Sequence, residues 1–456
     1  MNLNSNQDKN NNSLINSNLW HIIVRLSWPA MIAMIFQSFT SITDIYFLGK
    51  LGNSNAQAAI GIFSVLLMYL SSFNVIVGNG SVSVIAQYCG ACLFKEAGIA
   101  TVQTILLKFL GSIILIVPCL IFLKPLLILF GAKGLALDLG MKYGIIILLA
   151  LPLINAGYTF NTSLRAAGDA LTPMYLMLLT LSLNIILNYL FIFGFLKRFN
   201  LGIIGVSLST FISQFMLFLI GLKVYTSKKK IIKINIIDFL KPNFNIMKKI
   251  IMIGLPSGLQ GVLVSVASTI IIRFIAVSGM NAVAAYTVAT RTAGIAIMPI
   301  SGLSFATSTI SGQNIGADKP ERAVKATNIA LWLSFFITLI FFIVFTIFPL
   351  FFLRLFTSSK EVINYGKFIL PLFAFLQIIS ALISIYTAPM LGTGYLKPSF
   401  YISIISTWFV QIPLIIILNR FLKLNGIWLS FVIGNLVNLF LIYKVYMRKQ
   451  WFTKVV

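Results

Sequence analysis

One carboxylate lies inside an apolar stretch of this chain. Between Leu26 and Leu48 the sequence is apolar enough and long enough to span a bilayer as a helix, yet it contains Asp44. The other eight of the nine acidic residues fall in or next to polar connections. An ionised aspartate in the middle of a span costs about 2.5–3.5 kcal/mol. Its side chain is therefore expected to face a protein interior or a wet cavity, where it could hold a proton or a cation.

Polar side chains accompany Asp44 on one face of the same predicted helix. Gln37, Thr40 and Ser41 precede it by seven, four and three residues, which places all four on one face. In an alternative interpretation, Asp44 lies near the outer end of its helix and contacts the lipid headgroups. Two observations count against this: the polar stripe continues inward for two turns, and an aspartate side chain is too short to snorkel far.

Two later predicted spans carry further polar faces. The residues recur at i, i+4 spacing: Thr180, Asn184 and Asn188 on the fifth span, and Thr210 and Gln214 on the sixth. Taken alone, such faces are typical of an interhelical hydrogen-bond seam. Beside an unpaired Asp44 they favour another interpretation, because carboxylate, amide and hydroxyl oxygens are what a hard monovalent cation or a proton relay requires.

The composition excludes a soluble globular protein. Hydrophobic residues make up 59% of the chain, charged residues 9%, and the mean hydropathy is +0.98. Apolar runs recur along almost the whole length, which indicates a polytopic helical membrane protein rather than a closed barrel. The net charge of +25 is explained by Lys and Arg in cytoplasmic loops, since no basic stripe lies in a soluble domain. We expect no nucleic-acid partner.

The sequence offers no signature of a metal centre or an enzyme. Cys89 and Cys92 form a CxxC, but no second pair completes a zinc set, and the single histidine, His21, is not nearby. Paired carboxylates, a nucleophile elbow and a P-loop are all absent from the sequence. We therefore expect no enzyme activity, no metal site and no cofactor, and nothing supports a channel.

Twelve membrane spans are predicted. They cover residues 26–48, 57–80, 104–123, 143–161, 173–194, 202–222, 251–275, 283–308, 327–349, 367–388, 398–418 and 425–446. The domains that follow are a disordered N-terminal tail (1–20), an N-lobe (21–224), a basic cytoplasmic linker (225–250), a C-lobe (251–447) and a C-terminal tail (448–456). With both termini in the cytoplasm, 20 of the 34 Lys and Arg residues lie on the cytoplasmic side and 11 on the outer side. Lys108, about one turn into its span, is expected to snorkel to the surface.

The second half of the chain repeats the first. Pro29 aligns with Pro256, 227 residues later, and both prolines are predicted in the first turns of their helices. Gln87 aligns with Gln313, and this pair follows the proline pair in both halves of the chain. Each half holds six spans, an even number, so both halves enter the membrane in the same direction. This predicts two six-helix lobes related by a pseudo-twofold axis along the membrane normal, with a site between or within them.

These motifs resemble the MATE (multidrug and toxic compound extrusion) family. The resemblance rests on P-x14-D-x4-G-x2-G from Pro29 to Gly52, Q-x2-G-A at 87–91 and 313–317, RAAGDALTP at 165–173, and NIILNYLFIF at 184–193. It extends from the first span to the last. It implies two lobes in a V around a central cavity, and export of cationic amphiphilic compounds against inward movement of H+ or Na+. It also implies an N-lobe cation site at Asp44, Asn184, Asn188 and Thr210.

Two departures from the family pattern matter. Many relatives carry an acidic residue where this chain has Asn188, which favours proton coupling over sodium coupling. Other relatives place carboxylates in the seventh and tenth spans, where this chain has none, so no cation site is expected in the C-lobe.

A lipid-linked precursor flippase of the same superfamily is the alternative function. It would need cationic groups in the cavity to hold phosphates. Arg273 lies near the end of its span, whereas Arg291 is deeper and is a candidate cavity residue. Because there is one buried acid and no basic cluster, we favour an antiporter. We expect a monomeric, multi-pass protein of the plasma membrane, whose partners are small cationic organic compounds and membrane lipids.

Overall fold

The chain folds into helices joined by short connections. The structure, a computed structural model, describes residues 14–50, 54–194, 201–226 and 232–456, without the side chains of Ser41, Ile45 and Ile236. No β-strand occurs within these ranges. Most of the tail predicted over 1–20 lies outside the described residues. Helix is the expected solution for long apolar segments, because every backbone N–H and C=O is then satisfied within its own segment.

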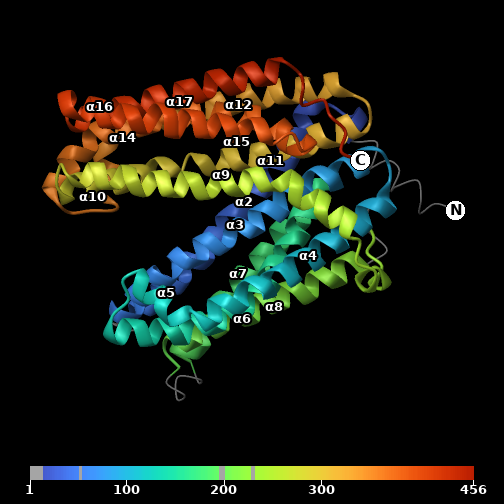
Figure 1. The fold of residues 1–456 in the computed structure, drawn as a ribbon, viewed down its shortest axis with the longest axis horizontal. Helices are drawn as coiled ribbons and strands as arrows, with labels where there is room; N and C mark the ends of the chain where they lie inside the picture. The colour runs from blue at the N-terminus through green and yellow to red at the C-terminus, as the bar shows by residue number, and fades with distance from the viewer. Residues whose placement is uncertain (1–13, 51–53, 195–200, 227–231) are drawn as a thin grey trace. The chain divides into compact units, whose positions relative to one another are not determined.

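The helices are labelled as in Figure 1. In the first half they are α2 (Leu19–Lys50), α3 (Ser54–Gly90), α4 (Phe94–Ile121), α5 (Leu123–Leu129), α6 (Gly134–Ala166), α7 (Leu171–Ile192), α8 (Ile203–Thr226) and the 3-10 helix η2 (Ile236–Leu240). In the second half they are α9 (Phe244–Ala276), α10 (Met280–Gly294), α11 (Ile297–Gly316), α12 (Pro320–Ile347), α13 (Pro349–Arg354), α14 (Lys360–Thr393), α15 (Lys397–Ile404), the π-helix η3 (Ile405–Gln411), α16 (Ile412–Leu422) and α17 (Leu424–Met447).

The predicted all-α, twelve-span architecture is confirmed. In the described part of the chain, 11 helical segments are long and apolar enough to cross a membrane, and α10 with α11 forms one further, bent span. The bend is 46° and was not predicted, since the sequence suggested a continuous span over 283–308. Its cause is local: Gly294 ends α10, and Pro299 cannot donate a helical hydrogen bond to Ile295.

The helices extend beyond the apolar runs from which they were predicted. This makes one prediction wrong: Pro29 and Pro256 do not lie in first turns. Because α2 starts at Leu19 and α9 at Phe244, each proline lies in the helix interior. Polar and basic residues continue the helix outside the apolar run, so hydropathy alone underestimates its length.

The chain divides into two compact units. One contains Ile32–Gly254, and the other contains the residues up to Met31 together with Leu255–Val456. Within the first unit α6 packs against α3, α4 and α8, and within the second α14 packs against α11, α12 and α17. Because α6 and α14 are the fourth spans of their halves, these are equivalent sets of neighbours. The repeat in the sequence is therefore also a repeat in the packing.

Glycine allows a close helix crossing at equivalent positions in the two units. A Cβ at Gly254 of α9 would lie 1.8 Å from the backbone oxygen of Ile76 in α3. A Cβ at Gly302 of α11 would lie 2.6 Å from the backbone oxygen of Ser27 in α2. Ser27 and Gly254 are 227 residues apart, as are Pro29 and Pro256, and Ile76 and Gly302 are 226 apart, as are Gln87 and Gln313. Only a residue without a Cβ permits such backbone contact.

We predict that Gly254→Ala destabilises the protein by about 1–3 kcal/mol, because the added methyl group meets backbone that cannot rotate away. The matched control is Gly261→Ala in the same helix, where a Cβ would meet nothing within 4 Å. That variant should be unchanged or slightly more stable, since alanine favours helix. Thermal unfolding of both variants in detergent measures the difference, and equal stability would contradict the crossing.

Candidate functional site

Asp44 lies in a cluster of hydrogen bonds formed by three helices. Asn188 Nδ2 of α7 donates to Asp44 Oδ1 at 2.8 Å, and Thr210 Oγ1 of α8 donates to Asp44 Oδ2 at 3.1 Å. Asn184 Nδ2 is 3.4 Å from both Asp44 Oδ1 and Thr210 Oγ1, and Asn188 Nδ2 is 3.2 Å from Asn184 Oδ1. The carboxylate is 7% exposed, and both asparagines are fully buried. The structure thus brings together the four residues implied by the family resemblance.

The local sequence explains why these helices present their polar groups to Asp44. On α7 the four-residue spacing of Thr180, Asn184 and Asn188 produces one polar face, and all three are buried. On α2, Phe47 and Leu48 follow Asp44 and belong to an apolar core shared with α3, α6, α7 and α8. This core fixes the end of α2 against its neighbours. Asp44 is thereby held where water has little access and hydrogen-bond donors converge.

The arrangement is suited to a carboxylate that binds and releases a proton or a metal cation. Asn184, Asn188 and Thr210 each donate to a carboxylate oxygen of Asp44, and charge-assisted hydrogen bonds of this kind stabilise the ionised form by about 1.5–3 kcal/mol each. Asn188 Oδ1 is buried and has no hydrogen-bond partner among the described residues. Carboxylate, amide and hydroxyl oxygens are therefore concentrated in one small volume. Oxygen ligands of these types match a hard cation, and the same groups can hold a proton.

The residues predicted to line a cavity differ from one another in exposure and in hydrogen-bond partners. Gln37 is exposed, and its Nε2 lies 3.4 Å from Tyr158 Oη on α6. The hydroxyls of Thr40 and Thr180 bond to carbonyls of their own helices. Gln214 is 8% exposed, and its Oε1 has no hydrogen-bond partner. The side chain of Ser41 lies outside the described part of the structure.

Arg291 does not belong to this cluster. It lies on α10 in the unit that contains Leu255–Val456, and its side chain is exposed. Within the described ranges no ion pair involves it.

Tyr143 is a neighbour of Asp44 that sequence analysis missed. It lies on α6, is 5% exposed, packs its ring edge-on against Phe63, and interacts electrostatically with Asp44. A single tyrosine in an apolar run has no polar partner at i+3 or i+4, so its position carries no periodic signal. Only the packing of α6 against α3 and α8 reveals it.

The prediction that Lys108 snorkels to the surface is wrong. Because α4 starts at Phe94, Lys108 lies in the middle of the helix, and its side chain is 1% exposed. Its ammonium group approaches Gly78 of α3, and the charged side chain that acts on it is Arg165, of the same sign. No acidic side chain pairs with it in the part of the chain that is described. This lysine is a buried basic side chain that is not part of the Asp44 cluster.

Cysteine, histidine and carboxylate side chains form no cluster of their own in the part of the chain that the structure describes. In the described ranges, no group of three or more could hold a metal ion, and Cys89, Cys92 and Cys119 are free.

The fold and the cluster define a class: a polytopic helical membrane protein built from two repeated six-span halves, with one buried carboxylate in the first. Comparison with known proteins agrees. The sequence profile of the MatE family matches the chain twice, over residues 29–190 and 256–417. The protein belongs to the MatE family.

Relatives of known name share most of their length with this chain. The probable multidrug resistance protein YoeA of Bacillus subtilis (strain 168) is 27% identical over 446 residues, covering 96% of each chain. The multidrug export protein MepA of Staphylococcus aureus (strain MSSA476) is 25% identical over 421 residues, covering 92% of this chain and 91% of its own.

Solved structures also match over nearly the whole fold. An outward-facing multidrug resistance MATE family transporter of the MOP superfamily superimposes with a TM-score of 0.87 at 26% identity, covering 96% of this chain and 97% of the other. A MOP superfamily transporter from Pyrococcus furiosus, whose reverse binding-pocket polarity is said to suggest a different function, gives the same values. The predicted family is therefore confirmed.

We predict that Lys108→Met stabilises the protein by about 1–3 kcal/mol. Methionine fills a similar volume and removes an amine that is buried with no acidic partner among the described residues. Lys95→Met, at an exposed position of the same helix, is the control and should gain nothing. The measurement is thermal unfolding in detergent. A loss of stability in Lys108→Met would show that the ammonium group is favourably bound in the native state.

Proposed function

We propose that the protein is a secondary antiporter that exports cationic amphiphilic compounds in exchange for H+ or Na+. The observation that carries this proposal is the buried Asp44 carboxylate, which is held by amide and hydroxyl groups and forms no ion pair within the described residues. The names of YoeA and MepA support multidrug efflux as the transport activity. Asp44 with Asn184, Asn188 and Thr210 is proposed as the coupling site.

The hydrogen-bond pattern supports two states of Asp44, one ionised and one protonated. In the ionised state, the amide N–H groups and the Thr210 hydroxyl donate to the carboxylate. In the protonated state the carboxyl group becomes a donor, and the unpartnered Asn188 Oδ1 can accept after a side-chain rotation. For Na+, rotation of the same amides would turn oxygens toward the ion. A few torsional changes in α7 therefore separate the loaded state from the empty one.

The inward movement of the coupling ion supplies the driving force for export. Each positive charge that moves inward releases about 2.3 kcal/mol per 100 mV of membrane potential, but a singly charged compound that moves outward offsets this, so a one-for-one exchange is driven by the concentration ratio of the ion. Loading Asp44 can favour one arrangement of the helices only by its difference in affinity between the two arrangements. We propose that the deprotonated carboxylate attracts the cationic compound and that protonation promotes its release.

A purely structural hydrogen-bond seam is the simpler interpretation of the same contacts. It accounts for Asn184 and Thr210, but it does not explain why a carboxylate was retained among them, since an uncharged side chain would avoid the cost of burial. A flippase would need several cations in its cavity to hold phosphates, whereas the cluster around Asp44 consists of a carboxylate, two amides and a hydroxyl. Deletion of the gene separates these functions: hypersensitivity to cationic drugs indicates export, whereas a cell-wall defect indicates a flippase.

We further propose that both termini face the cytoplasm. The basic linker over 225–250 supports this, as does the excess of Lys and Arg on the same side. Part of this linker is packed: the side chain of Gln103 on α4 bonds to the backbones of Lys241 and Asn243. The proposed lobes are 21–224 and 251–447, in the plasma membrane, and a monomer is sufficient for the mechanism.

Asp44→Asn should reduce drug efflux at least tenfold and abolish its dependence on pH, because an amide cannot bind and release a proton. Dye efflux from vesicles with an imposed pH gradient measures this. Thr40→Val is the control: among the described residues its hydroxyl bonds to Phe36 O of the same helix and not to the Asp44 cluster, so efflux should be nearly unchanged. Undiminished efflux by Asp44→Asn, at equal amounts of protein in the membrane, would eliminate the mechanism.

Asn188→Asp should increase the share of transport driven by a sodium gradient. The new carboxylate would lie within hydrogen-bond distance of Asp44, and two charges bind Na+ better than one. Gln214→Glu is the control, because it adds a buried acid on α8 without a bond to Asp44. Proteoliposomes with opposed sodium and pH gradients distinguish the variants. An unchanged ion preference in Asn188→Asp would show that this position does not select the ion.

A further inference from the structure

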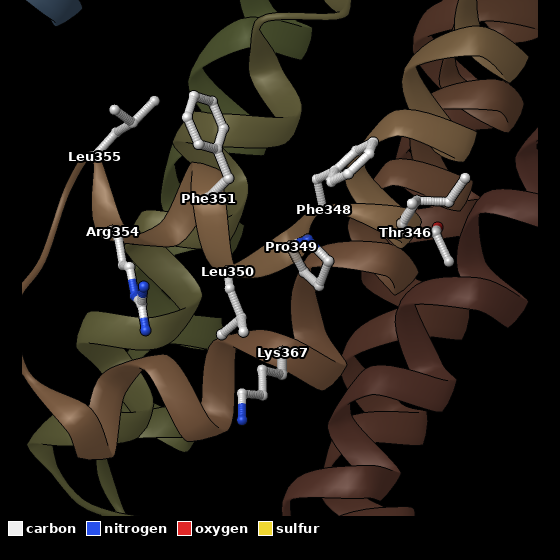
Figure 2. Close-up of a pocket in the computed structure, with 9 residues that line it drawn as sticks. Thr346, Phe348, Pro349, Leu350, Phe351, Arg354, Leu355 and Lys367 are labelled. Carbon is white, nitrogen blue, oxygen red and sulfur yellow. The ribbon is translucent and has the colours of Figure 1, made fainter.

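An unassigned pocket lies where α12, α13 and α14 connect. Here α12 ends at Ile347, the short helix α13 follows, and α14 begins at Lys360. The pocket has a volume of about 770 Å³ (Figure 2). Its lining consists of Thr346, Ile347, Phe348, Pro349, Leu350, Phe351, Arg354, Leu355 and Lys367.

The pocket is positively charged. Arg354 and Lys367 are its only charged lining residues, and both are exposed. Between residues 340 and 400 the sequence contains one acidic residue, Glu361, whose carboxylate accepts a hydrogen bond from Asn281 of α10. No ion pair to Arg354 or Lys367 is present in the described part of the chain. Their charges are thus available to an anionic ligand.

The rest of the lining is apolar and unusually exposed. Phe348 is 57% exposed, Phe351 62% and Leu355 64%. In Figure 2 the side chains of Arg354 and Lys367 extend toward one side of the view, whereas the ring of Phe351 and the side chain of Leu355 point the opposite way. The pocket therefore separates a cationic part from an apolar part, which is the complement of an amphiphilic anion.

An apolar stripe leads along α12 to this pocket. Its members are exposed large side chains spaced by four, four, three and four residues: Trp332 (64%), Phe336 (54%), Ile340 (61%), Ile343 (45%) and Ile347 (63%). Such spacing keeps them on one helix face, and in a membrane span that face contacts lipid. Because Ile347 also lines the pocket, the stripe and the pocket are continuous. An acyl chain could follow α12 while its headgroup occupies the pocket.

The position along α12 identifies the leaflet. The helix starts at Pro320, next to Asp318, which pairs with Lys454 near the C-terminus. The pocket is at the other end of α12, and so belongs to the leaflet opposite the C-terminus. Arginine and lysine with aromatic neighbours at the end of a span are typical of the headgroup region.

We propose that this pocket binds an anionic phospholipid. Arg354 and Lys367 hold the headgroup phosphate, and Phe348, Phe351 and the α12 stripe contact the acyl chains. A cationic compound of the kind proposed for export would be repelled here, and a small inorganic anion would leave the apolar part without a partner. The site belongs to the C-terminal half and does not depend on the Asp44 mechanism.

The test is a comparison of phosphatidylglycerol with phosphatidylcholine of the same acyl chains, added to the purified full-length protein in neutral detergent. Bound lipid is counted by native mass spectrometry. The unaltered protein should bind phosphatidylglycerol more tightly. Arg354→Gln/Lys367→Gln should weaken that binding about 30-fold, since each basic residue contributes roughly 1 kcal/mol near a lipid surface. Its affinity for phosphatidylcholine should be unchanged.

Arg420→Gln/Lys423→Gln is the matched control. It removes the same charge from exposed positions at the α16–α17 turn, which is at the same end of the C-terminal half as the pocket, and should bind phosphatidylglycerol normally. Equal binding of the two lipids by the unaltered protein would overturn the proposal, as would an unchanged affinity in the pocket variant. Displacement of the lipid by millimolar inorganic phosphate would overturn it in favour of a small-anion site. If the pocket variant does not fold, a salt titration of the unaltered protein decides: the preference for phosphatidylglycerol should fall as screening increases.

Discussion

The free-energy cost of burying one carboxylate in an apolar helix bundle determines how the helices around it must be oriented. Asp44 is 7% exposed, so almost every hydrogen bond that water would provide must come from the protein. Asn184, Asn188 and Thr210 provide them, which requires α7 and α8 to lie against the end of α2 with a defined rotation. The apolar core around Phe47, Leu48 and Phe63 keeps the helices in that arrangement. The hydrogen bonds to Asp44 and the apolar packing of the helices therefore depend on each other: a change in helix orientation would break the cluster, and loss of the cluster would change the orientation.

The close crossings at Gly254 and Gly302 impose a different constraint. At Gly254 the beginning of α9 crosses α3, and at Gly302 α11 crosses the beginning of α2. Both members of each crossing belong to the same compact unit. Backbone contact at this distance resists sliding, since no flexible side chain separates the helices. The beginning of α2 therefore moves with the unit that contains Leu255–Val456, and the beginning of α9 with the unit that contains Ile32–Gly254. Any rearrangement between the units must be absorbed within α2 and α9, close to Pro29 and Pro256, where the helical hydrogen bonding is already interrupted.

Much of the fold and of the Asp44 cluster could be predicted because both follow from simple sequence patterns, namely apolar runs and a four-residue spacing of polar residues. Twelve apolar runs give twelve spans, and the four-residue spacing on α7 brings Asn184 and Asn188 to one face. The errors have a common physical origin. Helices continue past the apolar run, so Lys108 and Pro29 were placed near helix ends when they lie inside. Tyr143 was missed because its role depends on the packing of α6, and the bend before Pro299 was missed because hydropathy does not register a lost hydrogen bond. Local patterns therefore identified the residues that act together on one helix, but not those that meet through tertiary packing.

The uncharged side chain of Asn188 beside Asp44 has an electrical consequence. Every other acidic residue described lies in a connection or in the first turns of a helix, so the first half offers a single titratable oxygen pair at depth. A turnover of the proposed exchanger could then trade one monovalent ion for one singly charged compound, and no net current would cross the bilayer. Voltage would not affect such a cycle, and only the concentration ratios on the two sides would drive it. A doubly charged compound carried by the same site would make the cycle electrogenic and directed against the interior-negative potential.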